Sequence, residues 1–331
     1  MWRAVSCEVR GRGHAKTGTP CQDKTMTLAR NGVNVIALAD GAGSAKLSHY
    51  GAEQVVNCLA GYLADNFLGL VENEDALQVT RQILETARNG LEGLAAELEC
   101  RTGDLASTFL AVAVLEDRFL IVHVGDGVIG YLKGGELKVA SGPDNGEFAN
   151  VTTFVTSGEA LASMRLIKGE AKDLAGFVLM SDGTQASLYD KVMNSLVRRM
   201  TTLMHWTCLL SADIMKERLL AAFDSVIIKQ TQDDCSLALL ARPIGLLSGG
   251  YTDLDALEKC EVMGLPPLAA NINKRLAWFD EAVDFLKTPR DLKSIAKHMR
   301  LKPNYTETRL QKLKARGLVA QREGVYFLAN R

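Results

Sequence analysis

The chain has 331 residues, enough for about two domains, and a formal net charge of −1. Hydrophobic residues make up 47% and charged residues 23%, which is ordinary for a soluble globular protein. No apolar run reaches the ~18 residues of a membrane span, and the N-terminus lacks the apolar core of a secretory signal. Seven cysteines are scattered without a CxxC pair. We therefore expect no membrane association, no disulfide framework, no zinc site and a cytoplasmic location.

The net charge conceals an asymmetry between the two parts of the chain. Residues 271–331 hold 14 Lys and Arg against 6 Asp and Glu, a net charge of +8, whereas the preceding residues have a net charge of −9. A basic tail on an acidic body predicts two units with different partners.

The first 242 residues read as strands and helices in an irregular order. Strands are predicted at residues 2–10 and 33–39, and helices at 46–68 and 74–98. Residues 105–141 are apolar and punctuated by turn residues, which is typical of a β-meander. Residues 142–165 are polar and are interpreted as a long flap or loop. Strands follow in 176–188 and 229–242, so the order indicates an α+β fold or a layered sheet sandwich, and excludes a regular βαβ repeat.

The remainder begins with a linker and ends in a compact pattern. Residues 242–270 hold three of the seven prolines and four glycines, and are interpreted as the linker. Helices predicted at 276–286, 290–299 and 306–317 precede a hairpin at 318–329, which is the layout of a winged helix-turn-helix. The basic charge allows DNA binding or a solvated face that packs or binds a protein partner, and the second interpretation is favoured.

Aspartates end several of the predicted strands. Asp40, Asp126 and Asp182 each follow an apolar strand and precede glycine, Asp233 lies just before another strand, and Asp23 in "GTPCQDK" is a fifth candidate. Asp-Gly is a common turn dipeptide, so each aspartate taken alone is most simply a turn residue. Together they predict carboxylates that converge at one edge of a sheet. Hard divalent cations prefer such oxygen ligands.

These motifs carry a family resemblance. "ALADGAGSA", "STFLAVAVLEDRFLIVHVGDGVIGYL", "FVLMSDG" and "DDCSLALL" occur in that order and resemble the motifs of the PPM family, the metal-dependent type 2C protein serine/threonine phosphatases. "GHAKTGTPCQD" resembles the first motif of a bacterial branch. The resemblance covers about residues 4–241. It implies an α-β-β-α sandwich, two central antiparallel sheets flanked by helices, and a site with two Mg²⁺ or Mn²⁺ ions.

The resemblance also implies a role for individual residues. Asp40 would bridge both metals and Gly41 would offer its carbonyl oxygen, while Asp182 and Asp233 would complete the shell of the first metal. Asp233 is chosen over Asp234 because the family's aspartate lies three residues before a Ser or Thr, here Ser236. Asp23 would act on the second metal, directly or through water. Asp126 matches an aspartate that helps to hold a weaker third metal in bacterial members.

The implied chemistry is hydrolysis of phosphoserine and phosphothreonine in proteins by a hydroxide that bridges the two metals, with Asp40 as the central catalytic residue. His14 is the candidate acid for the leaving oxygen, or else a structural or solvated loop histidine. The first motif lacks the family's phosphate-gripping arginine, for which His14 and Lys16 are the candidate substitutes, and "GDGVIG" lacks the Ser-Arg pair common after that Gly-Asp. A phosphoaspartate mechanism is excluded because Met180 occupies the nucleophile position, and Thr19 replaces the essential lysine of a P-loop.

The expected domains are a catalytic domain at 1–241, the linker at 242–270 and a winged-helix domain at 271–331. The expected partners are a phosphorylated protein substrate and a cognate Ser/Thr kinase or its target, in bacterial signalling. The rival hypothesis is a transcriptional regulator or sensor with a non-catalytic phosphatase-like body and a DNA-binding winged helix. The intact set of Asp40, Asp182 and Asp233 favours the enzyme, since a sensor is free to lose its metal ligands.

Overall fold

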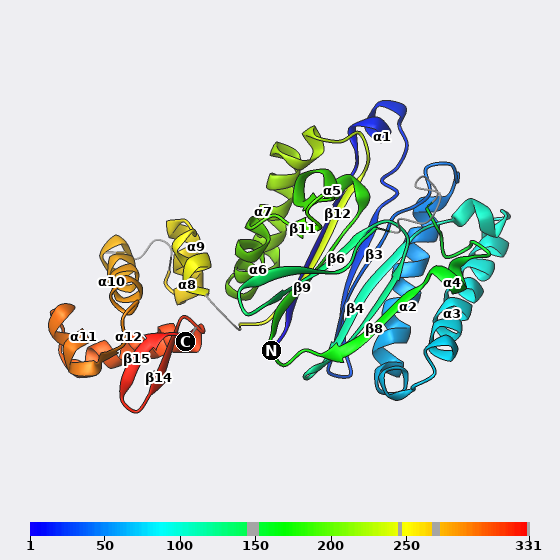
Figure 1. Ribbon diagram of the computed structural model, residues 1–331. Helices are drawn as coiled ribbons and strands as arrows, with labels where there is room; N and C mark the ends of the chain where they lie inside the picture. The colour runs from blue at the N-terminus through cyan, green and yellow to red at the C-terminus, as the bar shows by residue number, and fades with distance from the viewer. Residues whose placement is uncertain (144–151, 244–246, 267–271, 330–331) are drawn as a thin grey trace.

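The computed structural model describes residues 1–143, 152–243, 247–266 and 272–329. Two five-stranded antiparallel sheets face each other (Figure 1). The first has the order β1 (Arg3–Val9), β12 (Cys235–Ala241), β9 (Leu174–Met180), β6 (Val128–Lys133) and β7 (Glu136–Ser141). The second has the order β2 (Lys24–Arg30), β3 (Val33–Ala39), β4 (Phe109–Leu115), β5 (Arg118–Val124) and β8 (Arg165–Glu170).

Helices cover the outer face of each sheet. The long helices α2 (Ser48–Glu72) and α3 (Ala76–Glu97) pack on the second sheet, and α6 (Arg199–Leu209) and α7 (Ala212–Ser225) pack on the first (Figure 1). Shorter elements connect these layers: α1 (Arg12–Thr17), the 3₁₀ helix η1 (Thr102–Leu105), α4 (Ala160–Ser163), α5 (Asp182–Leu188), β10 (Tyr189–Asp190), β11 (Ser195–Leu196) and the 3₁₀ helix η2 (Ile227–Lys229). The expected sandwich of two antiparallel sheets is therefore confirmed.

Alternation along the central strands explains why both faces of each sheet are buried. In β3, Ile36 and Leu38 point into the core between the sheets, whereas Val35 and Ala37 pack beneath α2 and α3. Successive side chains of a strand point to opposite faces, so a strand with a covered sheet face on each side is apolar throughout. This is the reason that the strand sequences appear as continuous apolar runs.

The predicted β-meander is wrong in one respect. β4 and β5 form a hairpin in the second sheet, but β6 and β7 form a hairpin in the first. The chain changes sheet at Gly125-Asp126-Gly127, where Gly125 has φ of 114°, a conformation that L side chains rarely adopt. The glycine therefore permits the chain to cross from one sheet to the other at Asp126. In the predicted flap at 142–165, residues 144–151 lie outside the described residues, and the described part contains α4.

The segment interpreted as a linker contains two helices, α8 (Leu247–Thr252) and α9 (Ala256–Met263). The indole of Trp206 on α6 donates a hydrogen bond to the Gly250 carbonyl oxygen over 2.9 Å, and Arg218 on α7 forms an ion pair with Glu258 on α9. Asp255 and Glu258 form a capping box at the start of α9. Pro243 and Pro266 lie outside these two helices. The prolines therefore mark where the helical segment begins and ends, and do not indicate an extended linker.

The last part of the chain lies on the far side of α8 and α9 from the sheets (Figure 1). It contains α10 (Ile272–Phe285), β13 (Arg290–Asp291), α11 (Leu292–His298), α12 (Pro303–Ala315), β14 (Val319–Arg322) and β15 (Val325–Leu328). The three strands form a sheet with the order β13-β15-β14. The three predicted helices and the hairpin are present. No helix among the described residues is both long and apolar enough to cross a bilayer.

Candidate active site

Five aspartates meet at one edge of the sandwich, and we call this group the acidic edge: Asp23, Asp40, Asp126, Asp182 and Asp233. Asp40 follows β3, Asp126 separates β5 from β6, and Asp182 begins α5 just after β9. Asp233 precedes β12 and Asp23 precedes β2. The charge of each of the other four acts on Asp40. The strand ends therefore bring together all the carboxylates that the sequence singled out.

The backbone around Asp40 is held rigidly. The Asp40 N–H donates to Thr108 Oγ1 over 2.8 Å, and the Thr108 N–H donates back to the Asp40 carbonyl oxygen over 2.8 Å. The Gly41 N–H donates to the Gln22 carbonyl oxygen over 3.2 Å. A Cβ added to Gly41 would lie 2.8 Å from Ser48 Oγ, so only glycine fits this turn. The sequence thus needs glycine after Asp40 for packing, independently of any ligand role of its carbonyl oxygen.

The electrostatics of the acidic edge oppose full ionisation. Burial, followed by the charges of the other four aspartates, raises the pKa of Asp40 well above its usual range. Burial and then the neighbouring Asp126 and Asp233 raise the pKa of Asp182 to about 6. A hydrogen bond also joins the carboxyl groups of Asp182 and Asp40. Positive charge placed among these carboxyl groups would lower their pKa values and favour the ionised forms.

Asp23 lies deepest of the five. Its side chain is fully buried, its Oδ2 accepts a hydrogen bond from Ser236 Oγ over 2.7 Å, and Ser181 is a second side-chain partner. Burial is the main cause that raises the pKa of Asp23 to about 8. Oδ1 of Asp23 and Oδ1 of Asp182 are buried without a hydrogen-bond partner. Buried unpaired carboxylate oxygens are costly, which makes them suitable donors for a cation.

The donor set fits a hard divalent cation better than a closed structural metal site. Among the described residues, no group of three or more His, Cys, Asp or Glu side chains is placed so that it could hold a metal ion by itself. The acidic edge nevertheless offers carboxylate oxygens alone, and Mg²⁺ and Mn²⁺ bind through such oxygens with water in the remaining positions. Water would therefore have to complete the coordination of any ion held there, and the assignment of individual ligands remains a prediction.

Asp233 and Asp234 have different surroundings. Asp233 is exposed, and its Cβ would lie 3.4 Å from a Cβ added to Gly183, next to Asp182. Asp234 is buried and accepts hydrogen bonds from the backbone N–H groups of Gly11 (2.6 Å) and Gln22 (2.5 Å). Asp234 is not among the predicted metal ligands, but its carboxylate ties together the loop before α1 and the loop before β2. The sequence feature that points to Asp234 is the Asp233-Asp234 pair directly before a buried strand.

His14 lies on α1 with its Nδ1 2.9 Å from Asp234 Oδ2, and its side chain is 21% exposed. This contact places the ring beside the loop that carries Asp233. Lys16 is exposed on the same short helix. The structure thus joins His14 to the acidic edge through Asp234. Its role as an acid, and that of Lys16 or His14 in gripping phosphate, remain predictions.

Asp126 is held by residues that the sequence analysis missed. Thr152 Oγ1 donates to Asp126 Oδ2 over 2.6 Å, and Gln185 Nε2 donates to the Asp126 carbonyl oxygen over 2.5 Å. Arg165 donates to the carbonyl oxygens of Gly142 (2.7 Å) and Gly125 (3.3 Å), next to Asp126. These partners come from distant positions in the chain, and no local pattern in the sequence indicates them.

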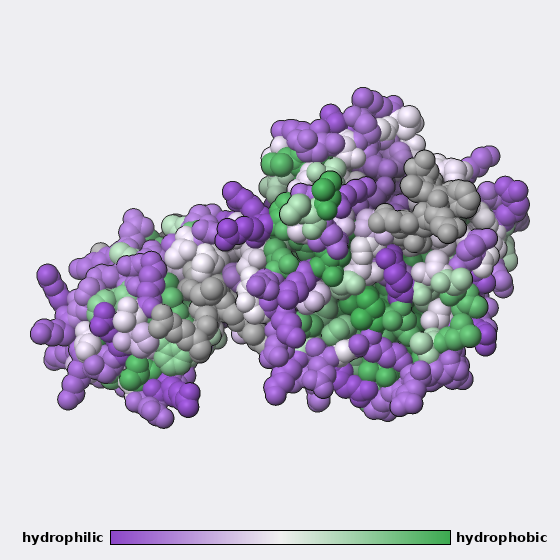
Figure 2. All heavy atoms as spheres, viewed as in Figure 1, coloured by the Kyte–Doolittle hydropathy of each residue, from purple (hydrophilic) through white to green (hydrophobic). Residues whose placement is uncertain are grey.

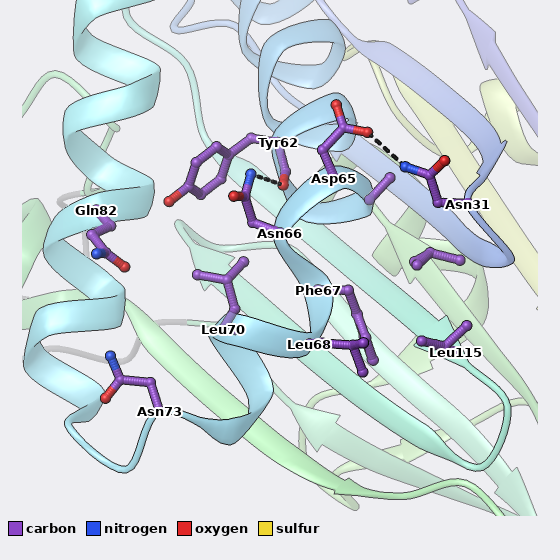
Figure 3. Close-up of a pocket in the computed structure, with 13 residues that line it drawn as sticks. Asn31, Tyr62, Asp65, Asn66, Phe67, Leu68, Leu70, Asn73, Gln82 and Leu115 are labelled. Atoms are coloured by element: carbon purple, nitrogen blue, oxygen red, sulfur yellow. Dashed lines mark hydrogen bonds between the residues drawn. The ribbon is translucent and has the colours of Figure 1, made fainter.

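A cavity of about 470 Å³ lies elsewhere, between α2, α3 and the turn that joins β2 to β3 (Figure 3). Its lining is mainly aliphatic side chains and amides such as Asn66 and Gln82. The one carboxylate in the lining, Asp65, accepts hydrogen bonds from Asn31 and Arg30. This cavity contains none of the acidic edge and offers no comparable chemistry.

Comparison with known proteins agrees with the geometry. The family model "Protein phosphatase 2C" matches residues 10–224. Serine/threonine-protein phosphatase 3 of Escherichia coli (strain K12) is 30% identical over 201 residues, which cover 59% of this chain and 78% of that protein.

Solved structures share the fold. The serine/threonine phosphatase of S. agalactiae aligns with a TM-score of 0.52 and 17% identity over 73% of this chain and 99% of that chain. The catalytic domain of the serine/threonine protein phosphatase PstP, in complex with two manganese ions, aligns with a TM-score of 0.50 and 21% identity over 72% and 97%. Given the matched family model and the E. coli relative, the chain belongs to the protein phosphatase 2C family and is a protein serine/threonine phosphatase.

Proposed function

We propose that this phosphatase hydrolyses phosphoserine and phosphothreonine in proteins only when Mg²⁺ or Mn²⁺ occupies the acidic edge. The observation that carries the proposal is the convergence of five aspartates from separate strand ends, which raises the pKa of Asp40 well above its usual range. Clustered, partly buried carboxylates repel one another, and bound divalent cations would remove that repulsion. The manganese ions in the PstP structure support the same class of metal.

The proposed ligand assignment follows the motifs that resemble those of the family. Asp40 would contact both ions and the Gly41 carbonyl oxygen would be a further ligand, while Asp182 and Asp233 would complete the shell of the first ion. Asp23 would act on the second ion directly or through water. Asp126 would help to hold a weaker third ion.

When bound, two divalent cations supply positive charge that offsets the phosphate oxygens and acidifies water near the phosphorus atom. The protein holds their ligands in place: Thr108 fixes the backbone of Asp40, and Ser236 and Ser181 orient Asp23. His14 is the proposed proton donor to the leaving serine or threonine oxygen. Because its Nδ1 lies beside Asp234, Nε2 is the nitrogen left to carry that proton.

No protein nucleophile is required. Cys21 is the thiol nearest in sequence to Asp23, and burial, followed by the charges of Asp234 and Asp23, raises the pKa of this thiol. A thiol with a raised pKa is a poor nucleophile at neutral pH. The proposed reaction therefore proceeds without a covalent phosphoenzyme. Its proposed substrate is a phosphoprotein made by a Ser/Thr kinase, and its proposed location is the cytoplasm.

The C-terminal part is proposed to be a winged helix. Its order of elements, α10-β13-α11-α12-β14-β15 with the sheet order β13-β15-β14, supports this. The domain boundaries at 241 and 271 remain a proposal. The packing of α8 and α9 on α6 and α7 supports counting residues 247–263 with the catalytic part. A purely non-catalytic sensor is disfavoured because all five carboxylates are retained.

The test is release of phosphate from a phosphothreonine peptide by the purified chain. We expect turnover with Mn²⁺ and background release after EDTA treatment, with recovery when Mn²⁺ is added back. Equal turnover in EDTA, with metal content verified as negligible, would contradict the metal-dependent mechanism while leaving the family assignment intact.

A further inference from the structure

We propose that one exposed face of α12 is a binding site for duplex DNA, separate from phosphate hydrolysis. α12 has thirteen residues, and Thr306, Leu310 and Leu313 are buried against the small C-terminal core. The opposite side of the helix carries Asn304, Thr308, Gln311 and Lys312, all exposed. We call these four residues the α12 stripe. Their spacing of four, three and one residues places them on one side of an α-helix.

The orientation of α12 is fixed by its neighbours. Just after the end of α11, the Leu301 N–H donates a hydrogen bond to the Ala296 carbonyl oxygen over 3.0 Å. Arg300 adopts a φ of 50° in the turn between α11 and α12. The Thr306 hydroxyl donates to the Lys302 carbonyl oxygen over 3.2 Å. Since Leu310 and Leu313 are fully buried, the stripe must face away from the core. α11 and α12 form a helix-turn-helix pair, and the exposed second helix of such a pair has the geometry that enters a major groove.

The chemistry of the stripe suits base edges and phosphates. Amide and hydroxyl groups such as those of Asn304, Thr308 and Gln311 pair with the donors and acceptors of base edges, and a lysine such as Lys312 pairs with phosphate. Tyr305 beside the stripe is 60% exposed and offers an apolar ring.

Charge around the stripe matches a polyanion. Residues 292–328 contain nine Lys and Arg against two Glu, a net charge of +7. The first of these carboxylates, Glu307, lies near Tyr326 of β15 and so toward the hairpin, and the second, Glu323, lies in the β14–β15 turn. Hydrophilic side chains predominate on the C-terminal face visible in Figure 2. Exposed lysines at 293, 297 and 302 extend the positive field from α11 toward the stripe.

Two nearby basic residues are already engaged and serve the fold. The guanidinium of Arg309 stacks 5.0 Å from the centroid of the Trp278 ring, and Lys314 Nζ donates to Gln321 Oε1 over 3.2 Å. Lys312 lies between them in sequence and is exposed on the stripe. The distinction makes Lys312 the informative position, because its substitution changes charge on the face without removing a packing contact.

The test uses the full chain and a fluorescein-labelled duplex of mixed sequence, about 25 base pairs long, followed by anisotropy at about 50 and 200 mM salt. We expect saturable binding that weakens steeply with salt. Lys312→Glu should weaken binding about tenfold or more at the lower salt and reduce the salt slope by about 1. The matched control is Lys191→Glu, the same charge reversal at an exposed position on the sandwich, which should bind like wild type.

Circular dichroism and thermal melting establish that each variant is folded, and its hydrolysis of a small phosphoester should be unchanged. Asn304→Ala supplies a second test without a charge change, and should reduce preference among duplex sequences more than overall affinity. The proposal is overturned if folded wild type does not bind the duplex, if Lys312→Glu binds as wild type does, or if both charge reversals weaken binding equally. Capture of an acidic protein through the stripe, with no duplex binding, would likewise replace DNA by a protein partner.

Discussion

The acidic edge and the α12 stripe carry charge in opposite ways. The aspartates gather at one edge of the sandwich, where burial raises the pKa of Asp40, Asp23 and Asp182. The basic residues around α12 lie in solvent on a small unit with a net charge of +7. Buried charge demands a specific counter-ion, whereas exposed charge attracts any polyanion and is screened by salt. The acidic edge is therefore expected to perform the phosphatase chemistry, and the α12 stripe is expected to bind a polyanion in a salt-dependent way.

The largest expected effect is at the centre of the acidic edge. Asp40→Asn keeps the shape of the side chain but removes the charge that the other four aspartates surround. We expect phosphatase activity to fall at least about a hundredfold, equivalent to about 2.7 kcal/mol of transition-state stabilisation. Steady-state hydrolysis of a small phosphoester at saturating Mn²⁺ measures it. Near-normal turnover with unchanged metal content would show that Asp40 is not a metal ligand.

The second effect concerns stability and pH in the absence of metal. Folded Asp23 has a pKa of about 8 and folded Asp182 of about 6, whereas an unfolded aspartate titrates near 4. The folded chain then binds more protons than the unfolded chain between about pH 4 and pH 8, so stability falls as pH rises through this window. Thermal melting in EDTA should show a lower Tm at pH 8 than at pH 5.

Mn²⁺ should reverse that trend, because it replaces the protons, and its stabilisation should be larger at pH 8. The Asp40→Asn variant is the control, since it should show a weaker dependence on pH. A metal-free Tm that rises between pH 5 and pH 8 would contradict the burial of these carboxyl groups.

A smaller effect is expected at Asp126, which lies at the crossing between the sheets. Its Oδ2 is already occupied by the Thr152 hydroxyl, and its backbone is held by Gln185. Asp126→Ala should reduce kcat about tenfold while the two tight ions remain bound. Calorimetric titration with Mn²⁺ separates the outcomes: loss of a tight site would move Asp126 into the core pair.

The smallest effect should come from the C-terminal unit. A chain that ends at Gly264 keeps α8 and α9, and with them the Trp206–Gly250 hydrogen bond and the Arg218–Glu258 ion pair. We expect its hydrolysis of a small phosphoester to stay within about threefold of the full chain, since every acidic-edge residue lies before residue 241. Complete loss of activity by a folded chain of this length would show that the tail contributes to the site.

The sequence predicted what local patterns encode. Apolar strands that end in Asp-Gly revealed Asp40, Asp126 and Asp182 as one group, and helical spacing revealed α10, α11 and α12. It did not reveal that the chain changes sheet at Gly125, because a hairpin within one sheet and a crossing between sheets have the same turn residues. Nor did it predict α8 and α9, since the glycines there serve close packing: a Cβ on Gly250 would lie 2.5 Å from His205 Cβ. Contacts such as Asp234 with Gly11 and Gln22 arise only in three dimensions.

The most direct test of the central claim is calorimetric titration of the metal-stripped chain with Mn²⁺ near pH 7.5, beside the Asp40→Asn variant. The arrangement of the acidic edge predicts two tight ions per wild-type chain, protons released on binding because Asp23 and Asp40 have raised pKa values, and loss of at least one tight ion in the variant. Equal binding by both proteins, or no tight binding by wild type, would contradict the assignment of the acidic edge as the metal site.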